Sequence, residues 1–157
     1  MGQLIRVELV DAAQAELVLR LAVEAFAEFR HVLVPPPGIL GETAADVARY
    51  IETGGAVLAW DGDIAVGSAR FHPEPDHFYI GRVAVPPAYR RRGVATVIMR
   101  FLEENARSLG FTETRVEVRQ ALPSNIALYE SLGYHPTGVH PHPRVPTAMI
   151  VKLTKRF

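Results

Sequence analysis

The stretch Val83-Ala-Val-Pro-Pro-Ala-Tyr-Arg-Arg-Arg-Gly-Val-Ala95 decides how this chain folds and what it binds. An apolar run ends at two prolines, which cannot donate to a sheet ladder, so a strand stops there. Three arginines follow, and Gly93 then opens a series of apolar residues at helical spacing. Unpaired N–H groups and the positive end of the helix dipole point into this loop. Such a strand–loop–helix unit is typical of a phosphate site.

The same loop excludes two common nucleotide-binding classes. Neither the GxxxxGK[ST] string of a P-loop nor the GxGxxG fingerprint of a dinucleotide fold occurs, so nothing indicates nucleotide hydrolysis or hydride transfer. A solvated helix start is the simpler explanation of the arginines. However, arginine at a helix N-terminus opposes the helix dipole, and this mismatch favours a bound anion.

Around this unit, periodicity predicts a mixed α/β (α+β) domain spanning residues 1–157. The expected order is β-α-α-β-β-β-α-β-α-β-β, a mostly antiparallel sheet of about seven strands flanked by four helices. Asp11 with Gln14 and Thr43 with Asp46 have the pattern of capping boxes. Gly81, inside the strand expected at 78–85, indicates a bulge or a close backbone approach. The remaining strands are expected at 4–9, 56–60, 64–71, 115–119 and in the tail, and the later helices at 93–109 and 123–132.

Composition narrows the function classes. The 157 residues include no cysteine, which excludes disulfides, thiolate metal sites and a cysteine nucleophile. Acidic and basic residues balance at 17 each. Residues 1–81 hold 12 acidic and 5 basic side chains, and residues 82–157 hold 5 acidic and 12 basic ones. A basic half suggests an anionic ligand there, although the two halves could also simply attract each other.

No apolar run approaches the roughly 20 residues of a membrane helix, and the start of the chain lacks the apolar stretch of a signal peptide. We therefore expect a cytoplasmic protein that does not bind a membrane.

A second stretch, Leu122-Pro-Ser-Asn-Ile-Ala-Leu-Tyr-Glu-Ser-Leu-Gly-Tyr134, predicts a short helix that begins at a proline and ends before Gly133. Asn125 and Tyr129 are four residues apart and therefore share a face of this helix. A buried amide needs hydrogen-bond partners, which a ligand could supply. Taken alone, a helix of this kind more commonly holds a capping asparagine and a core tyrosine.

Together the two stretches resemble the GNAT superfamily of N-acetyltransferases. Arg90-x-x-Gly93-x-Ala95 matches its [QR]-x-x-G-x-[GA] pyrophosphate motif. Asn125 followed by Ala127-Leu128-Tyr129-Glu130 and Leu132-Gly133-Tyr134 matches its N…A-L-Y-E-x-x-G-[FY] segment. The element order also resembles this fold, so the resemblance covers nearly the whole chain.

The resemblance implies acetyl-CoA as cosubstrate, bound in a wedge where the strand at 82–85 splays from the strand at 116–118. The pantetheine arm would pair with the backbone of that first strand, as an added strand does. The residues implied for this site are Val83, Ala84, Val85, Arg90, Arg91, Arg92, Gly93, Val94, Ala95, Thr96, Asn125 and Tyr129.

The resemblance also implies direct transfer of the acetyl group to a primary amine of a small molecule or peptide. A backbone N–H near Val85 would stabilise the oxyanion. Tyr129 would protonate the departing thiolate, because a tyrosine pKa of about 10 lies close to a thiol pKa of about 8.5. Many relatives place a glutamate on the fourth strand as base, but no carboxylate occurs at 78–85. The candidates are Glu117, Asp76, His77 or a water relayed from one of them.

Substrate contacts are expected between the first two helices and the last hairpin. Phe26, Phe29, Arg30 and the 35–40 loop would line one side, and His140 and His142 the other. Two histidines without a third ligand do not predict a metal site. The oligomeric state stays open, although a homodimer through the final strands is common in the family.

Two other functions compete with acetyl transfer. A non-catalytic acyl-CoA sensor would keep the cosubstrate site, and the missing fourth-strand carboxylate would fit it; the retained Tyr129 argues against it. A nucleic-acid binder would use Arg90–Arg92, but three arginines in a neutral chain are a poor electrostatic footprint, so we expect no nucleic-acid partner.

Overall fold

Alternating apolar residues build a single sheet that organises the chain. The computed structural model describes residues 4–157, and within them seven strands have the order β1-β2-β3-β4-β5-β7-β6. Every pairing is antiparallel except that of β4 with β5. The strands are β1 (Ile5–Val10), β2 (Gly55–Asp61), β3 (Ile64–Pro73), β4 (Phe78–Ala84), β5 (Glu113–Arg119), β6 (His135–Pro141) and β7 (Met149–Arg156). The predicted fold class and element order are confirmed.

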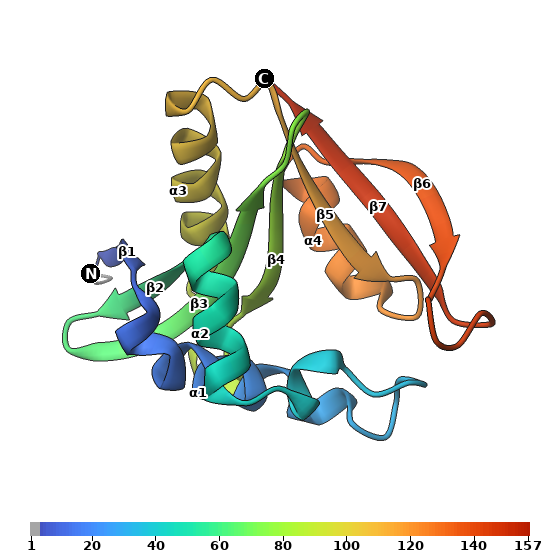
Figure 1. Cartoon of the computed structure of the whole chain (residues 1–157), viewed down its shortest axis with the longest axis horizontal. Coiled ribbons are helices and arrows are strands. Elements are labelled where there is room, and N and C mark those ends of the chain that lie inside the picture. Colours follow the sequence, from blue (N-terminus) through green and yellow to red (C-terminus); the bar gives the residue numbers. More distant parts are fainter. Residues whose placement is uncertain (1–3) are drawn as a thin grey trace.

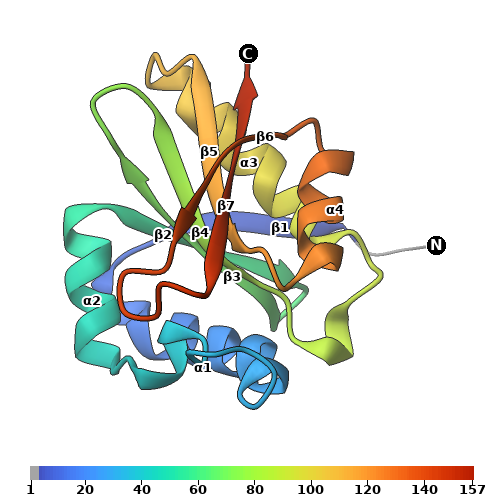
Figure 2. The same cartoon turned by 90° about the vertical axis from the view of Figure 1, so that its right-hand side faces the viewer.

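Four α-helices cover the sheet (Figures 1 and 2). They are α1 (Ala15–Phe26), α2 (Ala44–Thr53), α3 (Val94–Ser108) and α4 (Pro123–Ser131). Successive residues of a strand point to opposite faces, and β2 shows which helices cover each face. Ala56 and Leu58 pack in a core with α1 and α2. Val57 and Ala59 pack in a larger core with α3 and with Tyr129 of α4.

Local sequence signals set the helix starts. Thr43 and Asp46 form the predicted capping box, with hydrogen bonds of 2.8 and 3.2 Å. Asp11 does not form the predicted capping box. It caps a short 3₁₀ turn (Ala12–Gln14), in which its side chain accepts a hydrogen bond from the Ala13 N–H. The expected reciprocal bond from Gln14 is replaced by a backbone turn, in which the Gln14 N–H donates to the Asp11 carbonyl.

Strand β4 contains the predicted irregularity. Arg70 of β3 pairs with Gly81, but Ser68 pairs with Ala84, so β4 holds one extra residue between these positions. Such a bulge bends its strand. Arg82 lies in it with a left-handed φ of 49°, a conformation that non-glycine residues rarely adopt.

The sheet opens between β4 and β5. These strands pair only at Phe78 with Thr114 and Tyr79 with Arg115. In Figure 1 they lie together near the top of the view and diverge towards the bottom. The backbone of β4 beyond Tyr79 therefore has no strand partner on the β5 side, as the family resemblance implied.

Candidate active site

The loop between β4 and α3 has the backbone of an anion cradle. Arg91 and Gly93 both adopt left-handed φ angles, of 65° and 75°. The first backbone bond of the helix runs from the Val97 N–H to the Gly93 carbonyl, so the preceding amides have no acceptor within the helix. A Cβ built on Gly93 would meet no atom within 4 Å. The space above this glycine is therefore open to a ligand.

This loop lines a first cavity of about 430 Å³. Most of the residues expected to bind a cosubstrate gather on its wall. They are Val83, Val85, Arg90, Arg91, Gly93, Val94, Ala95, Thr96, Asn125 and Tyr129. Of the twelve expected residues, Ala84 and Arg92 do not line it. Ala84 is buried against α1, and Arg92 turns towards Asp61 of β2 at 3.4 Å.

The guanidinium of Arg90 is occupied by contacts within the protein. Its guanidinium donates to the carbonyls of Val85 and Ala25 at 2.9 and 3.1 Å, and it forms an ion pair with Glu28 at 2.6 Å. These contacts tie the end of α1 and the residues after it to the end of β4. Arg90 therefore shapes the cavity wall with its charge already balanced. Arg91 forms no ion pair within residues 4–157, and the Arg91 side chain is the arginine of this loop available to a ligand.

Helix α4 presents the two polar residues expected from the sequence. Asn125 is half-buried, and Tyr129 is only 8% exposed. Tyr129 packs edge-on against Tyr134, with ring centroids 6.0 Å apart, yet its hydroxyl makes no hydrogen bond within the described part of the chain. Burial, with a smaller contribution from Tyr79, raises the pKa of Tyr129 well above that of a free tyrosine. Its hydroxyl therefore stays protonated at physiological pH.

A second cavity of about 440 Å³ lies on the other side of these residues. It is bounded by β4, β5, the 33–38 loop and the segment after β6. The two cavities share four wall residues: Phe26, Val83, Asn125 and Tyr129. Tyr129 thus stands where a ligand in one cavity would meet a ligand in the other.

The positions of the two cavities distinguish between the candidate bases. Glu117 lines the second cavity, and its Oε2 lies 2.7 Å from Nε2 of His140. Asp76 and His77 instead bond each other at 2.7 Å, beside the closed end of the splay, and line neither cavity. Among the carboxylates considered from sequence, Glu117 is the one that faces the acceptor side.

The expected substrate residues divide between the cavities. Phe26 and His142 line the second cavity, and Pro37 and Gly38 from the expected loop join them. Phe29 lines the first cavity instead, because the 3₁₀ turn after α1 carries it towards the α3 loop. Arg30 lines neither cavity. His140 lines neither cavity, but its Nε2 contacts the Glu117 carboxylate, which lines the second one.

Sequence reasoning missed a group of second-cavity residues: Tyr50, Arg70, Tyr79, Arg82, Arg119 and Arg144. They come from α2, three strands and the segment after β6. For Arg82, Arg119 and Arg144 the only sequence signal was the basic excess of residues 82–157, which indicates no position; Tyr50, Arg70 and Tyr79 had no signal of this kind.

Comparison with known proteins identifies the chain. The profile described as "Acetyltransferase (GNAT) family" matches residues 23–134. This chain belongs to the GNAT acetyltransferase family. Membership supports acetyl transfer from acetyl-CoA. The match extends from α1 to the end of the α4 segment, and therefore includes the α3 loop, Glu117 and Tyr129.

Individual relatives agree with this assignment. "Probable N-acetyltransferase 14" of Xenopus tropicalis is 31% identical over 84 residues, which are 52% of this chain and 41% of that protein. The chain thus spans about two fifths of the length of that relative. PaiA N-acetyltransferase from Thermoplasma acidophilum, solved in complex with coenzyme A, has a TM-score of 0.81 at 12% identity, covering 99% of this chain and 100% of its own. IAA acetyltransferase from Bacillus cereus has a TM-score of 0.74 at 16% identity, covering 98% and 100%. These structural likenesses establish the fold.

Among the described residues of this GNAT family member, no helix is both long and apolar enough to cross a membrane.

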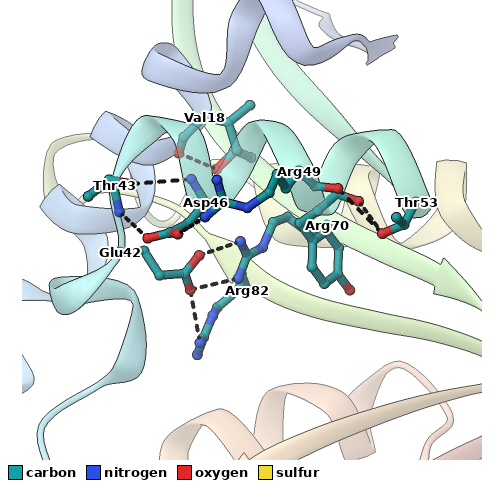
Figure 3. Close-up of polar contacts among 10 residues, drawn as sticks. Val18, Glu42, Thr43, Asp46, Arg49, Thr53, Arg70 and Arg82 are labelled. Carbon is teal, nitrogen blue, oxygen red and sulfur yellow. Dashed lines mark hydrogen bonds and ion pairs between the residues drawn. The ribbon is translucent and has the colours of Figure 1, made fainter.

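A buried ion-pair network supports the wall of the second cavity (Figure 3). Glu42, just before α2, accepts two hydrogen bonds from Arg70 at 2.8 and 3.0 Å and one from Arg82 at 3.2 Å. Burial alone would raise the pKa of Glu42, but the hydrogen bonds and charges of the two arginines outweigh it, and the pKa is lowered. Glu42 thus connects the start of α2 to the β4 bulge.

We predict that Glu42→Gln lowers the free energy of unfolding by about 2–3 kcal/mol at neutral pH, because it leaves the buried Arg70 without a counter-charge. Because the folded-state pKa of Glu42 is lowered, its stabilisation is complete above the unfolded value of 4.5 and is lost as pH falls through the folded value. Urea unfolding at several pH values measures both effects, and the gap between wild type and variant should shrink below pH 4.5.

Glu24→Gln is the matched control, since Glu24 forms an exposed ion pair with Arg20 on α1. This substitution should change stability by less than about 0.5 kcal/mol. Equal stability of wild type and Glu42→Gln at neutral pH would contradict the assignment.

Proposed function

We propose that this protein transfers the acetyl group of acetyl-CoA directly to a primary amine of a small molecule or peptide, with Tyr129 as the general acid. The observation that carries this proposal is the shared wall of the two cavities. Phe26, Val83, Asn125 and Tyr129 border both of them. An acyl donor in the first cavity and an amine in the second would therefore meet beside the Tyr129 hydroxyl.

The groups on the wall of the first cavity are those that coenzyme A would need. Free amides at Val94, Ala95 and Thr96 and the helix dipole suit its diphosphate. Glycine at position 93 leaves the loop backbone uncovered, as a close approach by phosphate requires. The unpaired edge of β4 at Val83 would take the amide groups of the pantetheine arm as an added strand. Bound in this way, acetyl-CoA supplies the activated thioester.

The reaction forms a bond between the amine nitrogen and the acetyl carbon and breaks the bond between that carbon and sulfur. One proton passes from the amine to the base, one proton passes from Tyr129 to the thiolate, and the phenolate then regains a proton from solvent, to which the base releases its own. The closeness of both substrates supplies part of the rate enhancement. A backbone N–H of β4 near Val85 would stabilise the developing oxyanion.

Tyr129 is suited to act as the general acid because its hydroxyl stays protonated until the thiolate departs. Its raised pKa keeps the hydroxyl neutral, and its lack of an internal acceptor leaves the O–H free for the ligand. A thiolate released into the same apolar surroundings is also destabilised as an anion, which brings its proton affinity towards that of the buried phenol. Burial therefore raises the proton affinities of both the Tyr129 phenolate and the thiolate, so proton transfer between them stays feasible.

Glu117 and His140 are suited to remove the amine proton. Glu117 lines the second cavity, and His140, whose side chain is 46% exposed, contacts Glu117 from outside it. The Glu117–His140 contact of 2.7 Å orients the imidazole. This pair takes the place of the fourth-strand glutamate of many relatives.

We expect Tyr129→Phe to lower kcat by about 10²-fold or more, because the departing thiolate loses its proton donor. The dissociation constant for acetyl-CoA should change little. Thiol release measures turnover, and calorimetry with acetyl-CoA measures binding.

Tyr134→Phe is the control, because it removes the buried hydroxyl of a neighbouring tyrosine that is hydrogen-bonded to Thr114 and Glu103. The ring centroids of Tyr129 and Tyr134 are 6.0 Å apart. This substitution should lower stability and leave kcat within about threefold of wild type, since Tyr134 lines neither cavity. Full activity in Tyr129→Phe would refute the acid role. Acetyl-CoA binding without turnover on any amine would favour a sensor.

Glu117→Gln should reduce kcat/KM for the amine by about 10–10²-fold near neutral pH, with partial recovery at high pH where more of the amine is already deprotonated. A pH–rate profile of wild type and variant measures this difference. Glu113→Gln on the same strand is the control, because Glu113 bonds Arg115 at 2.9 Å and lines neither cavity. A parallel profile for Glu117→Gln with no loss of rate would exclude Glu117 as base.

A further inference from the structure

The second cavity is strongly basic. Four arginines line it, namely Arg70, Arg82, Arg119 and Arg144, and Glu117 is the one acidic residue on the same wall. Glu42 adds one more negative charge behind the wall. Two carboxylates therefore face four guanidinium groups. Arg70 is buried and Arg119 half-buried, whereas Arg82 and Arg144 are exposed. The two less exposed cations lose hydration, so this concentration of like charge favours entry of an anion.

Internal ion pairs account for only part of this charge. Glu42 is shared between Arg70 and Arg82, and Glu117 is engaged with His140. The Nε of Arg70, a residue only 5% exposed, has no hydrogen-bond partner within residues 4–157. Arg70 therefore has a hydrogen-bond donor without an acceptor even though it forms two hydrogen bonds with Glu42.

Arg119 and Arg144 have no acidic partner in the described part of the chain. Arg119 makes one long hydrogen bond of 3.5 Å to the Pro36 carbonyl. Burial, followed by the charges of Arg82 and Arg144, lowers the pKa of Arg119. Arg82 and Arg144 therefore both lie close enough to Arg119 to repel its charge.

His142 adds an uncharged donor beside them. Its Nδ1 accepts from the backbone N–H of Arg144 at 3.0 Å, so in the neutral ring the proton is carried by Nε2. Partial burial, followed by the charges of Arg119 and Arg144, lowers the pKa of His142 and keeps the ring neutral. The same end of the cavity thus offers two guanidinium groups and an imidazole N–H.

We propose that the acceptor is a small amine that also carries an anionic oxygen group, a carboxylate or a phosphate, and that Arg119 and Arg144 bind this group. The inference rests on the proposed acetyl transfer and specifies its substrate class. Planar guanidinium groups match such oxygens with paired hydrogen bonds.

The strand geometry sets the spacing between the two ends of the acceptor. Glu117 and Arg119 are two residues apart on β5, so they point to the same side, and their Cα atoms are about 6.6 Å apart. With the amine held beside Glu117, the anionic group lies within reach of Arg119 when only a few bonds separate the two groups. Short amino carboxylates and aminoalkyl phosphates meet this condition, and simple alkylamines lack the second group.

Kinetics with matched acceptors tests the proposal. Each amino carboxylate is compared with its own amide, and an aminoalkyl phosphate with the corresponding amino alcohol, by thiol release from acetyl-CoA. We expect at least tenfold higher kcat/KM for the charged member of each pair. Arg119→Gln and Arg144→Gln should each remove most of this preference, chiefly through KM of the acceptor, while KM for acetyl-CoA stays near wild type. Arg100→Gln, an exposed arginine of α3 outside both cavities, is the control and should change nothing.

Calorimetry on the protein saturated with coenzyme A measures acceptor binding without turnover. The inference is supported if the charged acceptors bind more tightly than the neutral ones and if Arg119→Gln and Arg144→Gln each weaken that binding about tenfold or more. This support does not require turnover. If the charged acceptors bind but none is acetylated, the result counts against the proposed reaction and not against this inference. Equal kcat/KM and equal affinity for charged and neutral members, or a preference that survives both substitutions, would overturn the inference and leave acetyl transfer intact. The carboxylate and phosphate arms identify which anion is used.

Discussion

The short parallel pairing of β4 with β5 is the constraint on which the rest of the structure depends. Two residue pairs hold the strands together at one end, and the β4 bulge at Arg82 bends the strand beyond them. The strands then diverge, which leaves a backbone edge without a partner inside an otherwise continuous sheet. An open edge is costly in a buried setting and useful where a ligand completes it. Both cavities, and the Tyr129 wall between them, follow from this divergence.

Electrostatics then holds the sides of the opening in place. Arg90 connects the end of α1 to the end of β4 through two carbonyls and Glu28, and Glu42 connects the start of α2 to β3 and the bulge. In each case an arginine is balanced by a carboxylate of the acidic half of the chain. Arg82 and Arg90 of the basic half thus pair with Glu42 and Glu28 of the acidic half. Among the described residues, Arg119 and Arg144 are left without an acidic partner on the wall of the second cavity.

Local patterns were sufficient to predict the elements and the loop that precedes α3. The 43–46 capping box, the bulge after Gly81 and the helix that starts after Gly93 each depend on residues close in sequence. Long-range packing decided the rest. Nothing near Arg90 indicates that Glu28 and the Ala25 carbonyl would occupy its guanidinium. Phe29 was expected beside the acceptor, but a single 3₁₀ turn carries it to the other cavity. Arg119 and Arg144 lie 25 positions apart, and only the packing of β5 beside the segment after β6 brings them to one wall.

The central claim is that the free amides at the start of α3 bind the diphosphate of coenzyme A. Amide ¹H–¹⁵N chemical shifts of residues 93–96, recorded during titration with coenzyme A and separately with pantetheine, test it most directly. Large shifts with coenzyme A that are absent with pantetheine, which lacks the diphosphate, are the result that this account predicts. Saturable coenzyme A binding that leaves these four amides unmoved would contradict it.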